Sequence, residues 1–102
     1  MKVEPFGPLV PILTFKTFDE VIERANDNDL GLCSYLYTNS MDKAHTGSEK
    51  LESGCVAVNT GVVAIAEAPF GGIKQTGYGR EGGSGAIKDY LNVKYTHMGL
   101  KI

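Results

Sequence analysis

Glycine density in one stretch constrains this chain more than any other feature of its sequence. Seven of its 13 glycines fall between Gly71 and Gly85, and such density requires a backbone that turns sharply or lies close against another segment. The apolar side chains of Phe70, Ile73 and Tyr78 accompany these glycines, whereas a flexible linker is rich in serine and lacks such anchors. We therefore expect an ordered loop on which other parts of the molecule pack.

Residues 77–82 of this stretch match the pattern G-x-G-x-x-G, which marks a phosphate-binding turn in dinucleotide-binding units. That turn follows a buried strand, and an acidic residue comes about 20 positions later. Residues 71–76 contain no apolar run, and the acidic position would fall at the end of the chain. The pattern therefore indicates structural turns.

Composition and charge exclude several functional classes. The 102 residues suit one domain, and the net charge of -2 comes without a basic block that would attract nucleic acid or an anionic membrane. No apolar run approaches the roughly 20 residues that span a bilayer, and the N-terminus lacks the apolar region of a signal peptide. We therefore expect a cytoplasmic protein that binds neither nucleic acid nor a membrane.

The two cysteines do not form a metal or disulfide signature. Cys33 and Cys55 both lie in apolar, strand-like runs, and neither belongs to a CxxC or Cys/His spacing. We expect them to be small buried hydrophobic residues, and we expect no metal site.

Apolar patterning predicts an alternation of strands and helices. Leu9–Phe15 is nearly continuously apolar and predicts a first strand, although Pro11 removes one hydrogen-bond donor. Thr17 and Glu20 spell a capping box. It begins a helix whose apolar stripe is Phe18, Val21, Ile22 and Ala25.

The remaining elements follow from turn and cap signals. Leu32–Thr38 predicts a second strand, and Cys55–Val58 a third. Between them we expect a helix that Ser40 caps and Gly54 terminates, and after the glycine-rich loop a short helix capped by Ser84 and a strand over Val93–Met98.

The predicted fold class is α/β, with a partial parallel sheet in the order β-α-β-α-β, then the glycine-rich loop, a short helix and a C-terminal strand. A parallel sheet must be covered on both faces. Three short strands with two helices cannot provide that cover. The chain is therefore expected to be a piece of a larger fold or an obligate oligomer.

Several segments resemble, in order and spacing, the C-terminal part of NAD(P)-dependent aldehyde dehydrogenases, most closely the succinate-semialdehyde type. The segments are 4–8, 24–27, 31–32, 58–61, 68–82 and 87–95. Family members are several times longer. The resemblance implies that residues 1–83 are part of a catalytic domain including its substrate loop, and that residues 84–102 form a short helix and an oligomerisation strand.

The family's chemistry lies largely outside this segment. It uses attack of a cysteine thiolate on the aldehyde, hydride transfer to nicotinamide, and thioester hydrolysis by water that a glutamate activates. By resemblance both groups lie upstream, and neither Cys33 nor Cys55 matches the nucleophile motif. The chain therefore contains no catalytic residue and is expected to be inactive by itself.

Two residues are implied to touch the cofactor, NAD or NADP. Glu4 matches a glutamate that accepts hydrogen bonds from the nicotinamide ribose, and Phe6 matches an aromatic residue beside the nicotinamide ring. Without the resemblance, Glu4 would be a solvated side chain and Phe6 a packing residue at a strand entry.

The aldehyde substrate is implied to contact Phe70 and a nearby loop. Phe70 matches an aromatic residue of the substrate tunnel, with Val63, Ala64 and Ile65 in the specificity loop; the alternative for Phe70 is a packing role. Succinate-semialdehyde members commonly carry a serine in this loop, whereas this chain has Ala64 and Ile65. A related semialdehyde or a less polar aldehyde is compatible with that difference.

The other marked residues are expected to be structural. Lys74, Arg80 and Glu81 should fix the loop, and Tyr95 and His97 belong to the strand that pairs with a neighbouring subunit in the family. We therefore expect a homo-oligomer formed through this strand. The alternative to an enzyme segment is a non-catalytic interaction module that dimerises or docks on full-length relatives.

Overall fold

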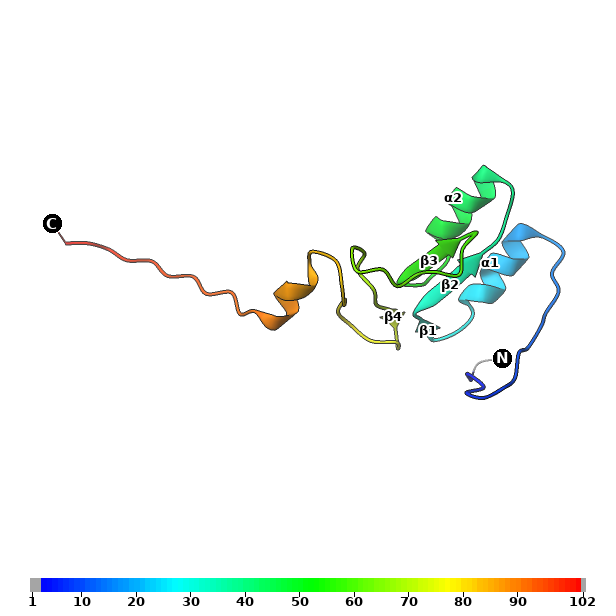
Figure 1. Cartoon of the computed structure of the whole chain (residues 1–102), viewed down its shortest axis with the longest axis horizontal. Coiled ribbons are helices and arrows are strands. Elements are labelled where there is room, and N and C mark those ends of the chain that lie inside the picture. The colour runs from blue at the N-terminus through cyan, green and yellow to red at the C-terminus, as the bar shows by residue number, and fades with distance from the viewer. Residues whose placement is uncertain (1–2, 102) are drawn as a thin grey trace.

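The computed structural model describes residues 3–101. In chain order its elements are α1 (Phe18–Asn26), β1 (Leu30–Gly31), β2 (Cys33–Leu36), α2 (Met41–Lys50), β3 (Cys55–Val58), β4 (Ile73–Lys74) and the 3-10 helix η1 (Ala86–Tyr90). Strands β2 and β3 pair in parallel, and β1 pairs with β4 in antiparallel orientation. Figure 1 shows α1 and α2 beside these strands, while the C-terminal segment runs far from this body.

Helix α1 begins at the predicted cap. Thr17 Oγ1 accepts a hydrogen bond from the Glu20 N–H at 3.2 Å. The Glu20 carboxylate accepts one from the Lys16 N–H at 2.9 Å and forms an ion pair with Arg24 at 3.1 Å. The Lys16 hydrogen bond, with the Arg24 guanidinium, lowers the pKa of Glu20 from its ordinary value.

Helix α2 also begins as predicted but ends differently. Ser40 Oγ accepts a hydrogen bond from the Lys43 N–H at 3.4 Å. The helix ends at Lys50 with Leu51 as its cap, so the prediction that Gly54 terminates it is wrong. Gly54 instead lies against the glycine-rich loop, where a Cβ atom would be only 1.8 Å from the Gly71 carbonyl oxygen.

The predicted five-element sheet is only partly present. Leu9–Phe15 pairs with no strand among residues 3–101, and its large apolar side chains are 55–84% exposed. Pro11 lacks an N–H and cannot donate a hydrogen bond to a neighbouring strand. In the described chain β2 pairs only with β3, so no strand pairs with Leu9–Phe15. The parallel part is therefore a single β2-α2-β3 unit, accompanied by the small β1-β4 pair.

The region after the glycine-rich loop also differs from the prediction. The short helix is the 3-10 turn η1, whose N-cap is Gly85 without a side-chain hydrogen bond, so Ser84 does not cap it. Val93–Met98 is not assigned as a strand and is exposed along its length. A strand is stable only with a hydrogen-bonding neighbour, and the described residues supply none here.

The chain does not bury a core appropriate to its size. Among residues 3–101, the buried hydrophobic side chains are Ile22, 8% exposed, and Ala57, 4% exposed. The radius of gyration is 19.3 Å, whereas a compact domain of this length has about 13 Å. The extended ends and the small sheet account for this large radius and for the exposure of most large apolar side chains.

We predict that the purified chain self-associates. Large apolar side chains are exposed along the N-terminal segment and the C-terminal tail, including Phe6 at 97% and Val93 at 101%, and contiguous apolar surface promotes association. Analytical ultracentrifugation should give a mass above the 11.0 kDa of one chain, increasing with concentration. A stable monomer that binds no hydrophobic dye would contradict this prediction.

Candidate functional site

The predicted substrate loop is anchored at its start by Asn59. This residue follows β3 with a φ of 56°, in the left-handed region that asparagine tolerates better than most residues. Its Oδ1 accepts a hydrogen bond from the Thr38 N–H at 2.9 Å, and its Nδ2 donates one to the Thr38 oxygen at 2.9 Å. The end of β2 therefore fixes where the loop leaves the sheet. Sequence reasoning did not single out Asn59, although an asparagine directly after a strand was a usable signal.

The glycine-rich segment anchors the other end of this loop. The Gly83 N–H donates to the Ala66 oxygen at 2.9 Å. Phe70 and Glu81 exchange two backbone hydrogen bonds, at 2.7 and 2.8 Å. A Cβ atom at Gly82 would lie 2.9 Å from the Ala68 oxygen, so a larger residue would push the two segments apart. These contacts order the glycine-rich stretch, as its composition predicted.

The loop between these anchors presents apolar side chains to solvent. Val62 is 62% exposed and Ile65 is 53% exposed, Ala64 is exposed, and Val63 is half-buried. Residues 61–66 include no side chain that can form a hydrogen bond. Any polar contact between this loop and a ligand must therefore come from its backbone.

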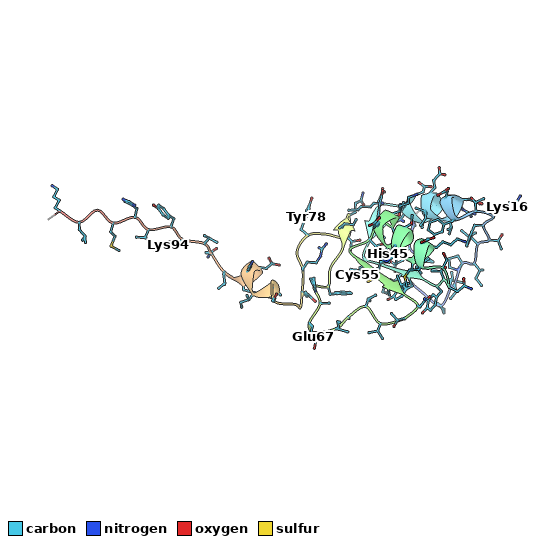
Figure 2. The ribbon with its side chains drawn as sticks, turned by 90° about the horizontal axis from the view of Figure 1, so that it is seen from above. Lys16, His45, Cys55, Glu67, Tyr78 and Lys94 are labelled. Carbon is cyan, nitrogen blue, oxygen red and sulfur yellow. The ribbon has the colours of Figure 1, made fainter. Side chains whose placement is uncertain are left out.

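Phe70 lines a groove that the loop residues 62–65 do not share. This half-buried residue lines a groove of about 300 Å³ with Tyr78, Arg80, Glu81 and Tyr90 among others. Figure 2 shows Glu67 on the loop, with Tyr78 projecting from the opposite side of this region.

The predicted cofactor residues lie in the N-terminal segment. The exposed Glu4 lines a groove of about 850 Å³ that also contacts β1, β2 and residues 52–53 and 75–76. The backbone carbonyl oxygen of Glu4 accepts a hydrogen bond from the Phe6 N–H at 3.0 Å, and the Phe6 side chain is 97% exposed. Glu4 and Phe70 line different grooves, so this segment alone does not unite the predicted cofactor and substrate residues.

Lys74 and Arg80 hold the glycine-rich loop, in agreement with their predicted structural role. Lys74 Nζ donates to the backbone carbonyl oxygens of Asn26 and Asn28, both at 3.0 Å, and forms an ion pair with Glu52. Its positive charge thus sits at the C-terminal end of α1, where a cation is favourable. Arg80 Nη1 donates to the Gly72 oxygen at 2.9 Å.

The G-x-G-x-x-G pattern forms turns, as predicted. Gly79 has a φ of 87° and Gly82 a φ of 66°, values that side-chain-bearing residues rarely adopt. No helix begins within residues 77–82.

The fold brings the two cysteines together. Cys33 and Cys55 are direct partners in the parallel register of β2 and β3, and both are half-buried free thiols. Burial, followed by the neighbouring Cys55, raises the pKa of the Cys33 thiol. The sequence interpretation expected buried hydrophobic residues rather than a disulfide pair, because the two cysteines lie 22 positions apart and spacing alone does not give the register. They are half-buried rather than buried. Within residues 3–101 no group of three metal-ligating side chains occurs.

Comparison with known proteins assigns the chain to a family. A sequence model of the aldehyde dehydrogenase family matches residues 1–96. The chain belongs to this family. It is 46% identical over 99 residues to the NADP(+)-dependent succinate-semialdehyde dehydrogenase of Escherichia coli K12, with 97% of the chain and 20% of the relative covered. It is 49% identical over 96 residues to the 3-sulfolactaldehyde dehydrogenase of Pseudomonas putida, with 94% and 20% covered.

Solved aldehyde dehydrogenases share the fold of this segment. The NAD+ complex of the aldehyde dehydrogenase from Bacillus cereus superposes with a TM-score of 0.87 at 45% identity, with 91% of the chain and 19% of that structure covered. The chain thus spans about a fifth of the length of these aldehyde dehydrogenases. These comparisons do not confirm its expected place at their C-terminal end. No helix in residues 3–101 is long and apolar enough to cross a membrane.

Proposed function

We propose that this chain is a segment of an NAD(P)-dependent aldehyde dehydrogenase that oxidises an aldehyde or semialdehyde to the carboxylic acid. The family match over residues 1–96 carries this proposal. In it, residues 1–83 belong to the catalytic domain and residues 84–102 to a helix and an oligomerisation strand. The cysteine nucleophile and the glutamate base come from the rest of the parent protein.

The chain's contribution at the cofactor is to bind and orient. When bound, the nicotinamide supplies the hydride acceptor. The exposed Glu4 carboxylate lines a groove of about 850 Å³, and an ionised carboxylate is a suitable acceptor for ribose hydroxyl groups. Phe6 offers a flat apolar face that would limit movement of the nicotinamide ring. These side chains fit the chemistry of the cofactor, because one accepts hydrogen bonds and the other packs.

At the substrate the chain contributes an apolar wall. Phe70 is held by its two backbone hydrogen bonds to Glu81, and Val63, Ala64 and Ile65 form the adjacent loop. The named relatives act on succinate semialdehyde and 3-sulfolactaldehyde, which both carry an anionic group. Since one hydrogen bond to a charged group is worth about 1.5–3 kcal/mol, a loop without such side chains favours a less polar aldehyde relative to these substrates.

A non-catalytic interaction module is the second candidate. The exposed, extended segment over residues 91–101 supports it, because an extended segment can add as a strand to the sheet edge of another chain. The coding sequence upstream discriminates between the two candidates. An open frame that encodes a cysteine nucleophile and a glutamate base supports the enzyme, whereas an in-frame stop supports the module.

Glu4→Gln tests the role of the chain in the full-length protein. The substitution keeps the size of the side chain but removes its charge, so the ribose hydroxyl groups lose a charged acceptor. We expect a fall in kcat/KM for NAD(P) of about tenfold, the effect of roughly 1.4 kcal/mol. Steady-state kinetics with varied cofactor would measure it.

Glu23→Gln is the matched control for this experiment. Glu23 is exposed on α1 and lines none of the described grooves, so its substitution should leave the constants unchanged. If Glu4→Gln also left the cofactor constants unchanged, the role proposed for Glu4 would be wrong.

A further inference from the structure

We propose that Cys33 and Cys55 form a reversible disulfide that links β2 to β3 next to the substrate wall. Formation of the bond rests on the strand register and on the surroundings of each thiol, whereas its effect on the substrate wall rests on the proposed function. The two residues are direct partners at the start of the parallel β2-β3 pair. Both are free thiols in this structure and half-buried.

The register brings the two thiols within reach of each other. Neighbouring strands lie about 4.8 Å apart, within the Cα separation of about 4.4–6.8 Å that disulfides span. Parallel side chains keep their Cβ atoms at about this spacing, slightly beyond the preferred separation of about 3.5–4.5 Å, and the resulting strain makes the bond easier to reduce. Paired residues in a sheet direct their side chains to the same face, so both sulfur atoms lie on one side. Ser34, the next residue along β2, faces the other way and contacts the Ser53 hydroxyl.

The two thiols differ in their surroundings. Cys33 lines the groove of about 850 Å³, which also contains Glu4, whereas Cys55 does not line it. In the proposed reaction a small disulfide such as oxidised glutathione therefore reacts with Cys33 first. The Cys55 thiol donates a hydrogen bond to the Gly71 backbone oxygen, with a sulfur to oxygen distance of 3.7 Å. Figure 2 shows Cys55 within the folded body, near α2.

The reaction is two successive thiol-disulfide exchanges. The Cys33 thiolate attacks one sulfur of oxidised glutathione, forms a mixed disulfide and releases one glutathione thiolate, which takes up a proton. The Cys55 thiolate then attacks the Cys33 sulfur and releases the second glutathione. The cysteine pair loses two electrons and two protons, and one oxidised glutathione becomes two reduced molecules. Because thiolates react and burial raises the pKa of Cys33, oxidation should accelerate with increasing pH.

The bond would act on the predicted substrate wall through Gly71. A disulfide has no S–H, so the Gly71 oxygen loses its contact with the Cys55 thiol. Gly71 follows Phe70 directly, and Gly54, the neighbour of Cys55, has no space to move toward Gly71. Oxidation therefore removes a hydrogen bond from the residue that follows Phe70, while the two backbone hydrogen bonds between Phe70 and Glu81 remain.

The test is redox titration of the full chain in glutathione buffers at low protein concentration. Acid quenching, alkylation of free thiols and mass spectrometry of the intact chain distinguish the dithiol, the glutathione adduct and the intramolecular disulfide. In native buffer, the intramolecular disulfide should form at a ratio of reduced to oxidised glutathione about tenfold more reducing than in concentrated urea, because the folded strands hold the thiols together.

A register variant provides the control. Cys33→Ser combined with Ser34→Cys keeps two thiols and shortens the intervening chain by one residue, but it places the first thiol on the opposite face of β2. This variant should form the intramolecular disulfide no more readily in buffer than in urea. The proposal would be overturned if the original chain formed the intramolecular disulfide equally readily in buffer and in urea, or if the two chains formed it equally readily in buffer. It would also be overturned if only glutathione adducts or intermolecular disulfides formed.

Discussion

The 102-residue chain, purified by itself, is expected to oxidise no aldehyde in the presence of NAD or NADP. Its cysteines are Cys33 and Cys55, and both lie at the start of paired strands. Catalytic cysteines have lowered pKa values from nearby cations or helix N-termini, whereas burial and Cys55 raise the pKa of Cys33. The loss relative to a complete enzyme should be on the order of a millionfold or more, because the thioester route is unavailable.

Reduction of NAD or NADP, followed by its absorbance with succinate semialdehyde and with an uncharged aldehyde of similar length, would measure this. The succinate-semialdehyde dehydrogenase of Escherichia coli provides the positive control. Turnover at an enzyme-like rate would contradict the proposal that the nucleophile and base come from elsewhere, particularly if Cys33→Ser or Cys55→Ser abolished that turnover.

Gly54→Ala should be the most destabilising single substitution in the segment. An added Cβ atom would lie 1.8 Å from the Gly71 oxygen and 2.8 Å from Gly72 Cα. Both contacts are with backbone atoms, which cannot move aside as the end of a side chain can. Overpacking of this kind costs typically 1–3 kcal/mol and occasionally more, so we expect a loss of roughly 3 kcal/mol and displacement of the loop that carries Phe70.

Two measurements would detect these effects. Urea unfolding followed by circular dichroism gives the change in the free energy of unfolding, and limited trypsin digestion reports cleavage after Lys74 and Arg80 in the glycine-rich loop. Gly85→Ala is the control, because a Cβ atom there meets nothing within 4 Å and its φ is -85°. Equal stability and equal cleavage for the two variants would show that Gly54 is not required for this close approach.

Local signals in the sequence predicted the starts of α1 and α2 correctly, although not the start of η1. Thr17 and Ser40 each accept the hydrogen bond expected of a cap, because capping depends on residues only three positions apart. The third strand, Cys55–Val58, has the predicted bounds. The glycine-rich loop also is ordered as expected, since its requirement for positive φ angles is a property of individual residues.

Predictions that needed a distant partner succeeded less well. Leu9–Phe15 and Val93–Met98 have strand-like sequences, yet neither pairs with a strand in the described residues. Apolar composition shows that a segment can be buried, but hydrogen bonding to a neighbour decides whether it becomes a strand. The roles of Glu4, Phe6, Phe70 and the loop residues 63–65 remain predictions, because Glu4 and Phe70 line different grooves and the loop residues line neither.

The sequence by itself determined the N-terminal caps of α1 and α2, the turn-forming glycines and the family, because each depends on residues that lie near one another or on motifs in fixed order. Only the tertiary structure decided that Cys33 lies opposite Cys55, that Asn59 ties the substrate loop to Thr38, and that Gly54 touches Gly71. These contacts join residues 17–22 positions apart. Their register depends on how the β2-α2-β3 unit packs, which no local pattern specifies.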